Sequence, residues 1–107
     1  MALHVHETAL QLITEIKPLL ASIARHDRNL ANQLRRAATS VCLNIAEGEY
    51  SDPGTKRARF RSAAGSAGET RSALRVAMAW DYVKGQRVLD ALDQLDRVIA
   101  TLWKLTH

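Results

Sequence analysis

The sequence predicts an all-α protein, an antiparallel up-and-down four-helix bundle built as one domain over residues 1–107. Apolar residues recur at steps of three and four along four segments, which is the spacing of amphipathic helices. The chain is 47% hydrophobic but only 5% aromatic, and such aliphatic composition suits closely packed helices better than sheets. Short connections between long helices favour an antiparallel bundle. We expect helices at about residues 3–25, 28–48, 53–83 and 86–104.

The first segment, 3–25, carries one continuous apolar stripe that faces a neighbouring helix. Pro18 lies inside this pattern and removes a backbone donor. Because the stripe continues in phase beyond it, we expect a kink near Thr14 and no helix end there. The stripe consists of Val5, Ala9, Leu12, Ile16, Leu19 and Ile23.

Capping residues delimit the other segments. Asp27 is a good N-cap for the segment 28–48, and Asp52 followed by Pro53 is a typical start for the segment 53–83. Gly85 is expected to end that helix. The segment 86–104 then carries a fourth stripe, which consists of Val88, Leu92, Leu95, Ile99 and Leu102.

Charge, cysteine count and hydropathy limit the classes of protein to which this chain can belong. The formal charge of +4 permits contact with nucleic acid or another anionic surface. Cys42 is the single cysteine, so it forms no internal disulfide, and we expect it to be buried. No apolar run reaches the ~18 residues of a membrane span, and the first residues do not resemble a signal peptide. We therefore expect a cytoplasmic protein with no membrane partner.

Two polar sets are expected to meet where the second and third helices pack together. Ser40, Asn44 and Glu47 share one side of the second helix at steps of four and three. Asn44 falls there on an otherwise apolar track that ends at Gly48, and Ser66 precedes Glu69 by one turn. Gly65, beside Ser66, belongs to a run of small residues that would let another helix approach closely, within or between subunits. We interpret the glutamates as part of a structural hydrogen-bond network. A catalytic or metal site is less favoured because no Glu-x-x-His pair is present.

The third segment carries the best functional signal. It has six basic residues and one acid between Pro53 and Arg75. Four arginines fall within about 40° of one line along the helix. Such a face can contact successive phosphates of a nucleic-acid backbone without reading sequence. The alternative is that the arginines are simply solvated or form ion pairs with a neighbouring subunit. The candidate residues are Lys56, Arg57, Arg61, Arg71 and Arg75.

The middle of the chain resembles a family of small four-helix-bundle proteins encoded in intervening sequences of 23S rRNA genes. It also resembles the related accessory variability proteins of diversity-generating retroelements. The matching residues, about 40% of the chain, are Leu34–Ala38, Ser40-Val41, Asn44-Ile45-Ala46-Glu47-Gly48, Arg59-Phe60 and Ala64-Gly65-Ser66-Ala67 with Glu69. The turn Glu49–Gly54 is more acidic than the aromatic, basic turn of the family, which shifts any nucleic-acid contact to the third helix.

The resemblance implies a ring-like homo-oligomer, expected to be a homopentamer, with no known enzymatic activity. We also expect no cofactor and no metal. In the retroelement branch it implies association with a reverse transcriptase and with RNA or DNA. Two functional classes follow: a nucleic-acid-associated adaptor, or a purely structural protein-interaction module. An enzyme that uses Glu47 and Glu69 is the least favoured interpretation.

Overall fold

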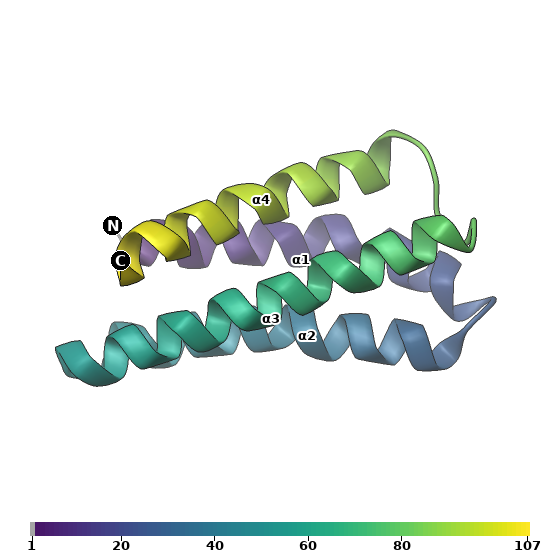
Figure 1. The fold of residues 1–107 in the computed structure, drawn as a ribbon. Coiled ribbons are helices and arrows are strands. Elements are labelled where there is room, and N and C mark those ends of the chain that lie inside the picture. Colours follow the sequence, from purple (N-terminus) through teal and green to yellow (C-terminus); the bar gives the residue numbers. More distant parts are fainter. Residues whose placement is uncertain (1) are drawn as a thin grey trace.

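The computed structural model describes the backbone of residues 2–107 and the side chains of residues 4–107. Four helices account for nearly all of this part of the chain, and it contains no strand, which confirms the all-α, four-helix prediction. The molecule is elongated, with principal extents of 42 × 23 × 20 Å. The helices are α1 (Ala2–Ala24), α2 (Arg28–Glu49), α3 (Pro53–Ala79) and α4 (Gln86–Thr106) (Figure 1).

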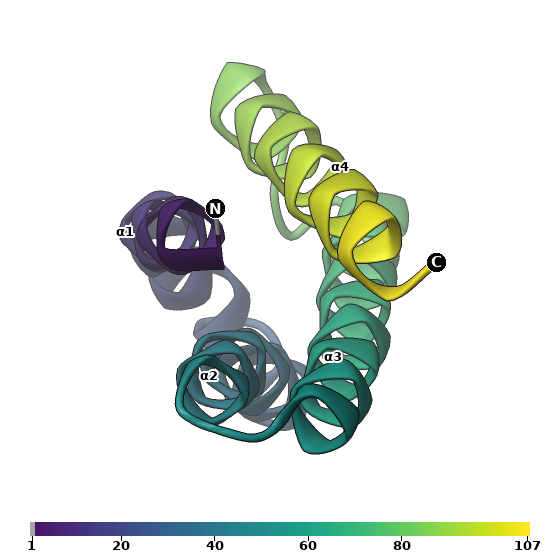
Figure 2. The ribbon, with the colours of Figure 1, turned by 90° about the vertical axis from the view of Figure 1, so that its left-hand side faces the viewer.

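Each helix packs against the one before it, and α4 also contacts α1. The chain reverses direction at each connection (Figure 1). The α1–α2 and α3–α4 connections lie at one end of the bundle, whereas the α2–α3 connection lies at the other end, beside both chain ends. Viewed from that latter end, α2 and α3 lie close together and α4 crosses over α3 at an angle (Figure 2).

The core is aliphatic, with Phe60 as its one large ring. The apolar stripe predicted for the first helix is buried along its whole length, and α1 continues through Pro18. Gly48, at the end of α2, lies directly against Phe60: a Cβ at Gly48 would stand 2.7 Å from the ring. The other fully buried large side chains are Val5, Leu12, Ile16, Ile23, Leu34, Val41, Ile45, Leu74, Val88, Leu95 and Leu102.

Both aspartates chosen from the sequence cap a helix. The Asp27 carboxylate accepts a hydrogen bond of 2.9 Å from the Leu30 amide at the start of α2. Asp52 accepts one of 2.9 Å from the Thr55 amide and another of 3.0 Å from its hydroxyl at the start of α3. These bonds satisfy amide donors that have no partner within the helix.

The third helix ends earlier than the sequence predicted. We expected it to continue to about residue 83 and to end at Gly85, but α3 ends at Ala79. Asp81 adopts a positive φ of 60°, its amide bonds to the Met78 carbonyl, and the Tyr82 amide bonds to the Ala77 carbonyl. This is the Schellman arrangement with aspartate in the place that glycine usually takes. Gly85, with a φ of 89°, instead precedes the first residue of α4.

Candidate functional site

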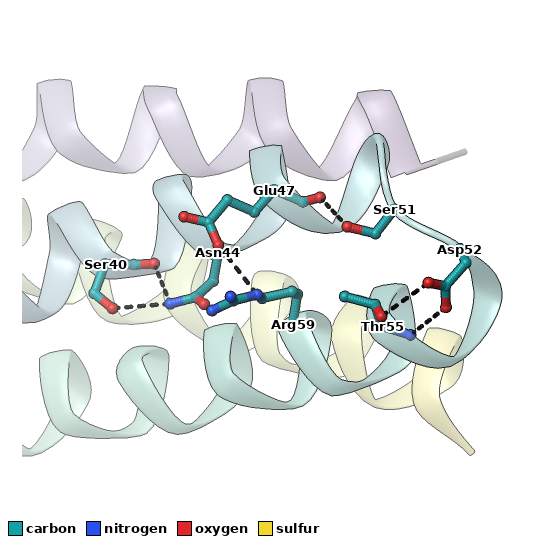
Figure 3. A network of polar contacts seen from close by, with 7 residues as sticks. All are labelled: Ser40, Asn44, Glu47, Ser51, Asp52, Thr55 and Arg59. Atoms are coloured by element: carbon teal, nitrogen blue, oxygen red, sulfur yellow. Dashed lines mark hydrogen bonds and ion pairs between the residues drawn. The ribbon is translucent and has the colours of Figure 1, made fainter.

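Hydroxyl and amide groups form a polar seam between α2 and α3. The hydroxyls of Ser40 and Ser66 lie 2.8 Å apart across the two helices. The Asn44 side chain donates to both the carbonyl and the hydroxyl of Ser40, each at 3.0 Å (Figure 3). Asn44 therefore lies half-buried at the edge of the apolar track and supports the hydroxyl contact between the helices.

The seam ends in an ion pair near the α2–α3 connection. Arg59 Nε lies 3.1 Å from Glu47 Oε2, and the two side chains are 47% and 57% exposed (Figure 3). Glu47 is therefore a surface carboxylate, and a pair this exposed contributes about 0–1 kcal/mol. The Ser51 hydroxyl donates to the Glu47 carbonyl at 2.8 Å and closes the end of α2.

Glu69 does not join this ion pair. It is exposed and lines an open groove of about 770 Å³ between α2 and α3, together with Arg36 and Ser66. Glu47 lines a neighbouring hollow of about 530 Å³ with Arg35, Arg36 and Arg59. The two glutamates thus occupy separate hollows, and each hollow is also lined by arginine.

The four arginines of α3 divide into two pairs. Arg57 and Arg71 turn toward α4: Arg57 Nε donates to the Thr106 carbonyl at 3.0 Å, and Arg71 Nε lies 2.8 Å from Asp96 Oδ1. Arg61 and Arg75 are exposed and form no hydrogen bond or ion pair with any side chain or backbone group of the described residues. Two of the four guanidinium groups are therefore free.

Lys56 is less accessible to a phosphate ligand than we expected from the sequence. It is half-buried, and its ammonium group lies 6.0 Å from the centre of the Phe60 ring, at the limit for a cation–π contact. With Arg57 it lines a hollow of about 300 Å³ against the end of α4, beside Thr106 and His107.

The mid-helix glycines of α3 lie on its outer face. An added Cβ at Gly65 or at Gly68 would meet no atom within 4 Å. No helix of the same protomer therefore approaches them closely, and the close contact within the protomer is made by Gly48 instead. Gly65 and Gly68 remain exposed between Arg61 and Arg75.

Sequence reasoning missed an aromatic cluster at the opposite end of the bundle. The Tyr82 ring stacks on His26, with centroids 4.9 Å apart, and on Trp80, with centroids 6.2 Å apart. His26 lies in the α1–α2 connection, whereas the other two rings follow α3. No local pattern brings these segments together, so no sequence signal could have found the cluster.

A few titratable groups are perturbed. Burial raises the pKa of the Glu15 carboxyl on α1, and the nearby Asp90 and Asp93 of α4 raise it further. Burial also raises the pKa of the Cys42 thiol, which suppresses its thiolate. Within residues 4–107, no three His, Cys, Asp or Glu side chains are arranged to hold a metal ion.

Fold and site together define a small four-helix protein with a polar α2–α3 seam and a basic outer helix. The model of the family described as 23S rRNA-intervening sequence protein matches residues 1–104. The chain belongs to that family.

Structural comparison agrees on the fold. The crystal structure of a protein of unknown function from the S23 ribosomal protein family of Bacteroides thetaiotaomicron is similar to this chain, with a TM-score of 0.87. The match covers 95% of this chain and 97% of that one at 18% identity. No curated protein matches the sequence. The relation to retroelement accessory proteins stays a prediction.

In the described part of the chain, no helix is both long and apolar enough to cross a membrane.

Proposed function

We propose that this protein is a non-catalytic, self-associating adaptor that holds the phosphate backbone of a nucleic acid on the outer face of α3. One observation carries the proposal: Arg61 and Arg75 are exposed and unpaired within the described chain, on the same helix face. Free guanidinium groups bind phosphate oxygens through paired hydrogen bonds.

The surface between these arginines suits a polyanion. Fourteen residues separate them, which is about 21 Å along a helix. Gly65, Gly68 and Ser72 lie exposed in the interval. Their small size lets a sugar–phosphate chain approach the helix closely. Arg71 reinforces the face, because its exposed pair with Asp96 is weak enough to exchange for a phosphate.

The test measures RNA affinity across a salt series. Arg61→Gln/Arg75→Gln should weaken binding and reduce the slope of log affinity against log salt by about 2, because each lost phosphate contact removes about one unit. Lys17→Gln/Lys104→Gln loses the same charge from exposed positions on α1 and α4 and serves as the control. Equal RNA affinity and equal salt dependence of the two variants would show that α3 is not the nucleic-acid-binding face.

A purely structural role is the second candidate, and the glycines favour it. A mid-helix glycine costs about 1 kcal/mol against alanine, and neither Gly65 nor Gly68 gains a contact within the protomer. A helix of a second copy packed against them would offset that cost, with Arg61 and Arg75 in intersubunit ion pairs. Under this alternative, Arg61→Gln/Arg75→Gln dissociates the oligomer, which light scattering detects.

Self-association has a separate surface available on α4. Leu89 and Trp103 are 49% and 59% exposed. They lie fourteen residues apart, and therefore within about 40° of one line along the helix. Burying these two apolar side chains against another copy is favourable, although the exposed Asp93 and Asp96 lie between them. We propose the ring-like homo-oligomer, with five copies as expected from the family resemblance, and sedimentation analysis measures its size. A monomer at micromolar concentration would refute the assembly.

A further inference from the structure

The aromatic cluster at the α3–α4 end has the character of a binding platform. Trp80 is 66% exposed although it stacks on Tyr82, which is half-buried and stacks in turn on His26. The Tyr82 ring is nearly parallel to both, at 2° to His26 and 15° to Trp80. The cluster therefore presents a tryptophan to solvent on a supporting layer of rings.

The backbone beneath the rings is firmly held. The Trp80 amide bonds to the Val76 carbonyl at 3.0 Å, and the Tyr82 amide bonds to the Ala77 carbonyl at 2.9 Å. Asp81 between them has the positive φ that turns the chain. The backbone that carries Trp80 and Tyr82 is thus held by the end of α3, so a ligand that stacks there does not have to order the main chain.

A hollow of about 540 Å³ adjoins Tyr82. Its lining combines an apolar floor, polar groups and two cations. The cations are Lys84 and Arg87, and both are exposed. Arg25 and Arg28, also exposed, lie within two residues of His26 in the sequence. Asp81 is the acid of the hollow, while the nearby Asp27 is occupied in capping α2. The remaining lining residues are Pro18, Leu19, Ser22, Val83 and Gln86.

We propose that this end of the bundle binds unpaired nucleotides of a single strand, with a base stacked on Trp80 and the adjoining phosphate held by Lys84 and Arg87. Aromatic rings beside cations are the means by which proteins hold single strands without reading sequence. A duplex keeps its base faces stacked inside and offers none to Trp80. The inference rests on the proposed function in its ligand class, nucleic acid, but uses a different surface.

Tryptophan fluorescence gives a direct test. The chain has two tryptophans, so Trp103→Phe leaves Trp80 as the sole reporter. Titration with short oligothymidylate and oligouridylate should quench this emission, and a duplex of equal length should not. The two single strands distinguish DNA from RNA as the ligand. Quenching by the duplex to the same extent, or no quenching by either strand, would overturn the proposal.

Affinity measurements with labelled oligothymidylate supply the second arm. Trp80→Ala should weaken binding by about tenfold or more, the scale of one lost stacking contact. Tyr50→Ala, which removes an exposed aromatic ring at the other end of the bundle, is the matched control and should bind normally. Lys84→Gln/Arg87→Gln leaves every ring in place and should also weaken binding. An equal loss in Tyr50→Ala would refute the assignment to Trp80.

The proposal for the α3 face and the proposal for the aromatic cluster can be refuted independently. If Arg61→Gln/Arg75→Gln binds RNA normally while oligothymidylate still quenches Trp80, the α3 face is wrong and the platform stands. If duplex and single strands bind alike, Trp80→Ala has no effect and Arg61→Gln/Arg75→Gln still weakens RNA binding, the platform is wrong and the α3 face stands. A protein that binds the cluster in place of nucleic acid would leave oligonucleotide titrations flat, which also refutes the platform.

Discussion

Gly48 and Phe60 form the tightest contact that any glycine of the described chain makes: a Cβ on Gly48 would lie 2.7 Å from Cε1 and 2.8 Å from Cδ1 of the ring. The contact joins the end of α2 to the first turns of α3 across the short connection between them. Because the ring is itself almost fully buried, it has little room to move. Glycine here is a packing requirement.

Gly48→Ala should therefore destabilise the fold. The added methyl group gains about 1 kcal/mol in helix propensity, but overpacking against a buried ring costs about 1–3 kcal/mol. We expect a net loss, measured as a lower midpoint in urea unfolding. Gly65→Ala is the matched control, since its new methyl group would meet nothing within 4 Å, and it should raise protomer stability by about 1 kcal/mol. Equal effects of the two variants would contradict the packing argument.

The hydroxyl pair of Ser40 and Ser66 should show measurable coupling. Each single change to alanine removes a bond of 2.8 Å between the helices. The double-mutant cycle should give a coupling free energy of about 0.5–1.5 kcal/mol. Ser72→Ala, at an exposed position of the same helix, should be nearly neutral. Additive effects of the two seam changes would show that the contact contributes nothing.

Asp52 should make the stability of the fold depend on pH in the acidic range. Its hydrogen bonds from Thr55 hold the pKa of this carboxyl below its ordinary value of 3.8. The stabilisation is therefore fully present above that value and is lost as the pH falls through the lower folded pKa. Asp52→Asn keeps an oxygen acceptor but cannot titrate. We expect unfolding midpoints of the parent to fall more steeply toward about pH 2 than those of the variant. Parallel curves would contradict the cap's contribution.

The Glu15 carboxylate should destabilise the fold at neutral pH, whereas the Asp52 carboxylate stabilises it. Burial, together with Asp90 and Asp93, raises the pKa of this carboxyl above its ordinary value of 4.5, although Arg97 partly opposes them. One of its oxygens is buried without a hydrogen-bond partner within the described chain. The cost of the charge is thus fully present above the raised folded pKa and disappears below the ordinary value.

Glu15→Gln should accordingly raise the urea midpoint at neutral pH and change it little in acid. Glu7→Gln, at an exposed position on the same helix, is the control and should leave the midpoint unchanged at both. A variant that is less stable than the parent at neutral pH would show that the Arg97 attraction dominates.

Much of the fold follows from local signals. Apolar spacing identified the four helices, and Asp27, Asp52 and Pro53 marked two of their starts, because a cap acts within one turn. The end of α3 could not be predicted in this way. Asp81 takes a positive φ that is usually found at glycine. The next residue, Tyr82, stacks on His26 in the α1–α2 connection, a contact that no local sequence signal reports.

The site was predictable in part for the same reason. The meeting of Ser40 with Ser66 follows from two adjacent helices joined by a short turn. The pairing of Arg71 with Asp96 depends on how α3 and α4 are rotated about their axes, and a single sequence does not report that. Composition also could not distinguish Gly48, which packs against a ring, from Gly65, which faces open space.

The order of the helices in space has a consequence for how fast the chain folds. Three of the four helix–helix interfaces join segments that are consecutive in sequence, and only the α1–α4 interface links distant ones. Loop-closure entropy is then small for most of the structure, and such low contact order is typical of domains that fold in microseconds to milliseconds. We expect the three interfaces between consecutive helices to form before α4 docks on α1.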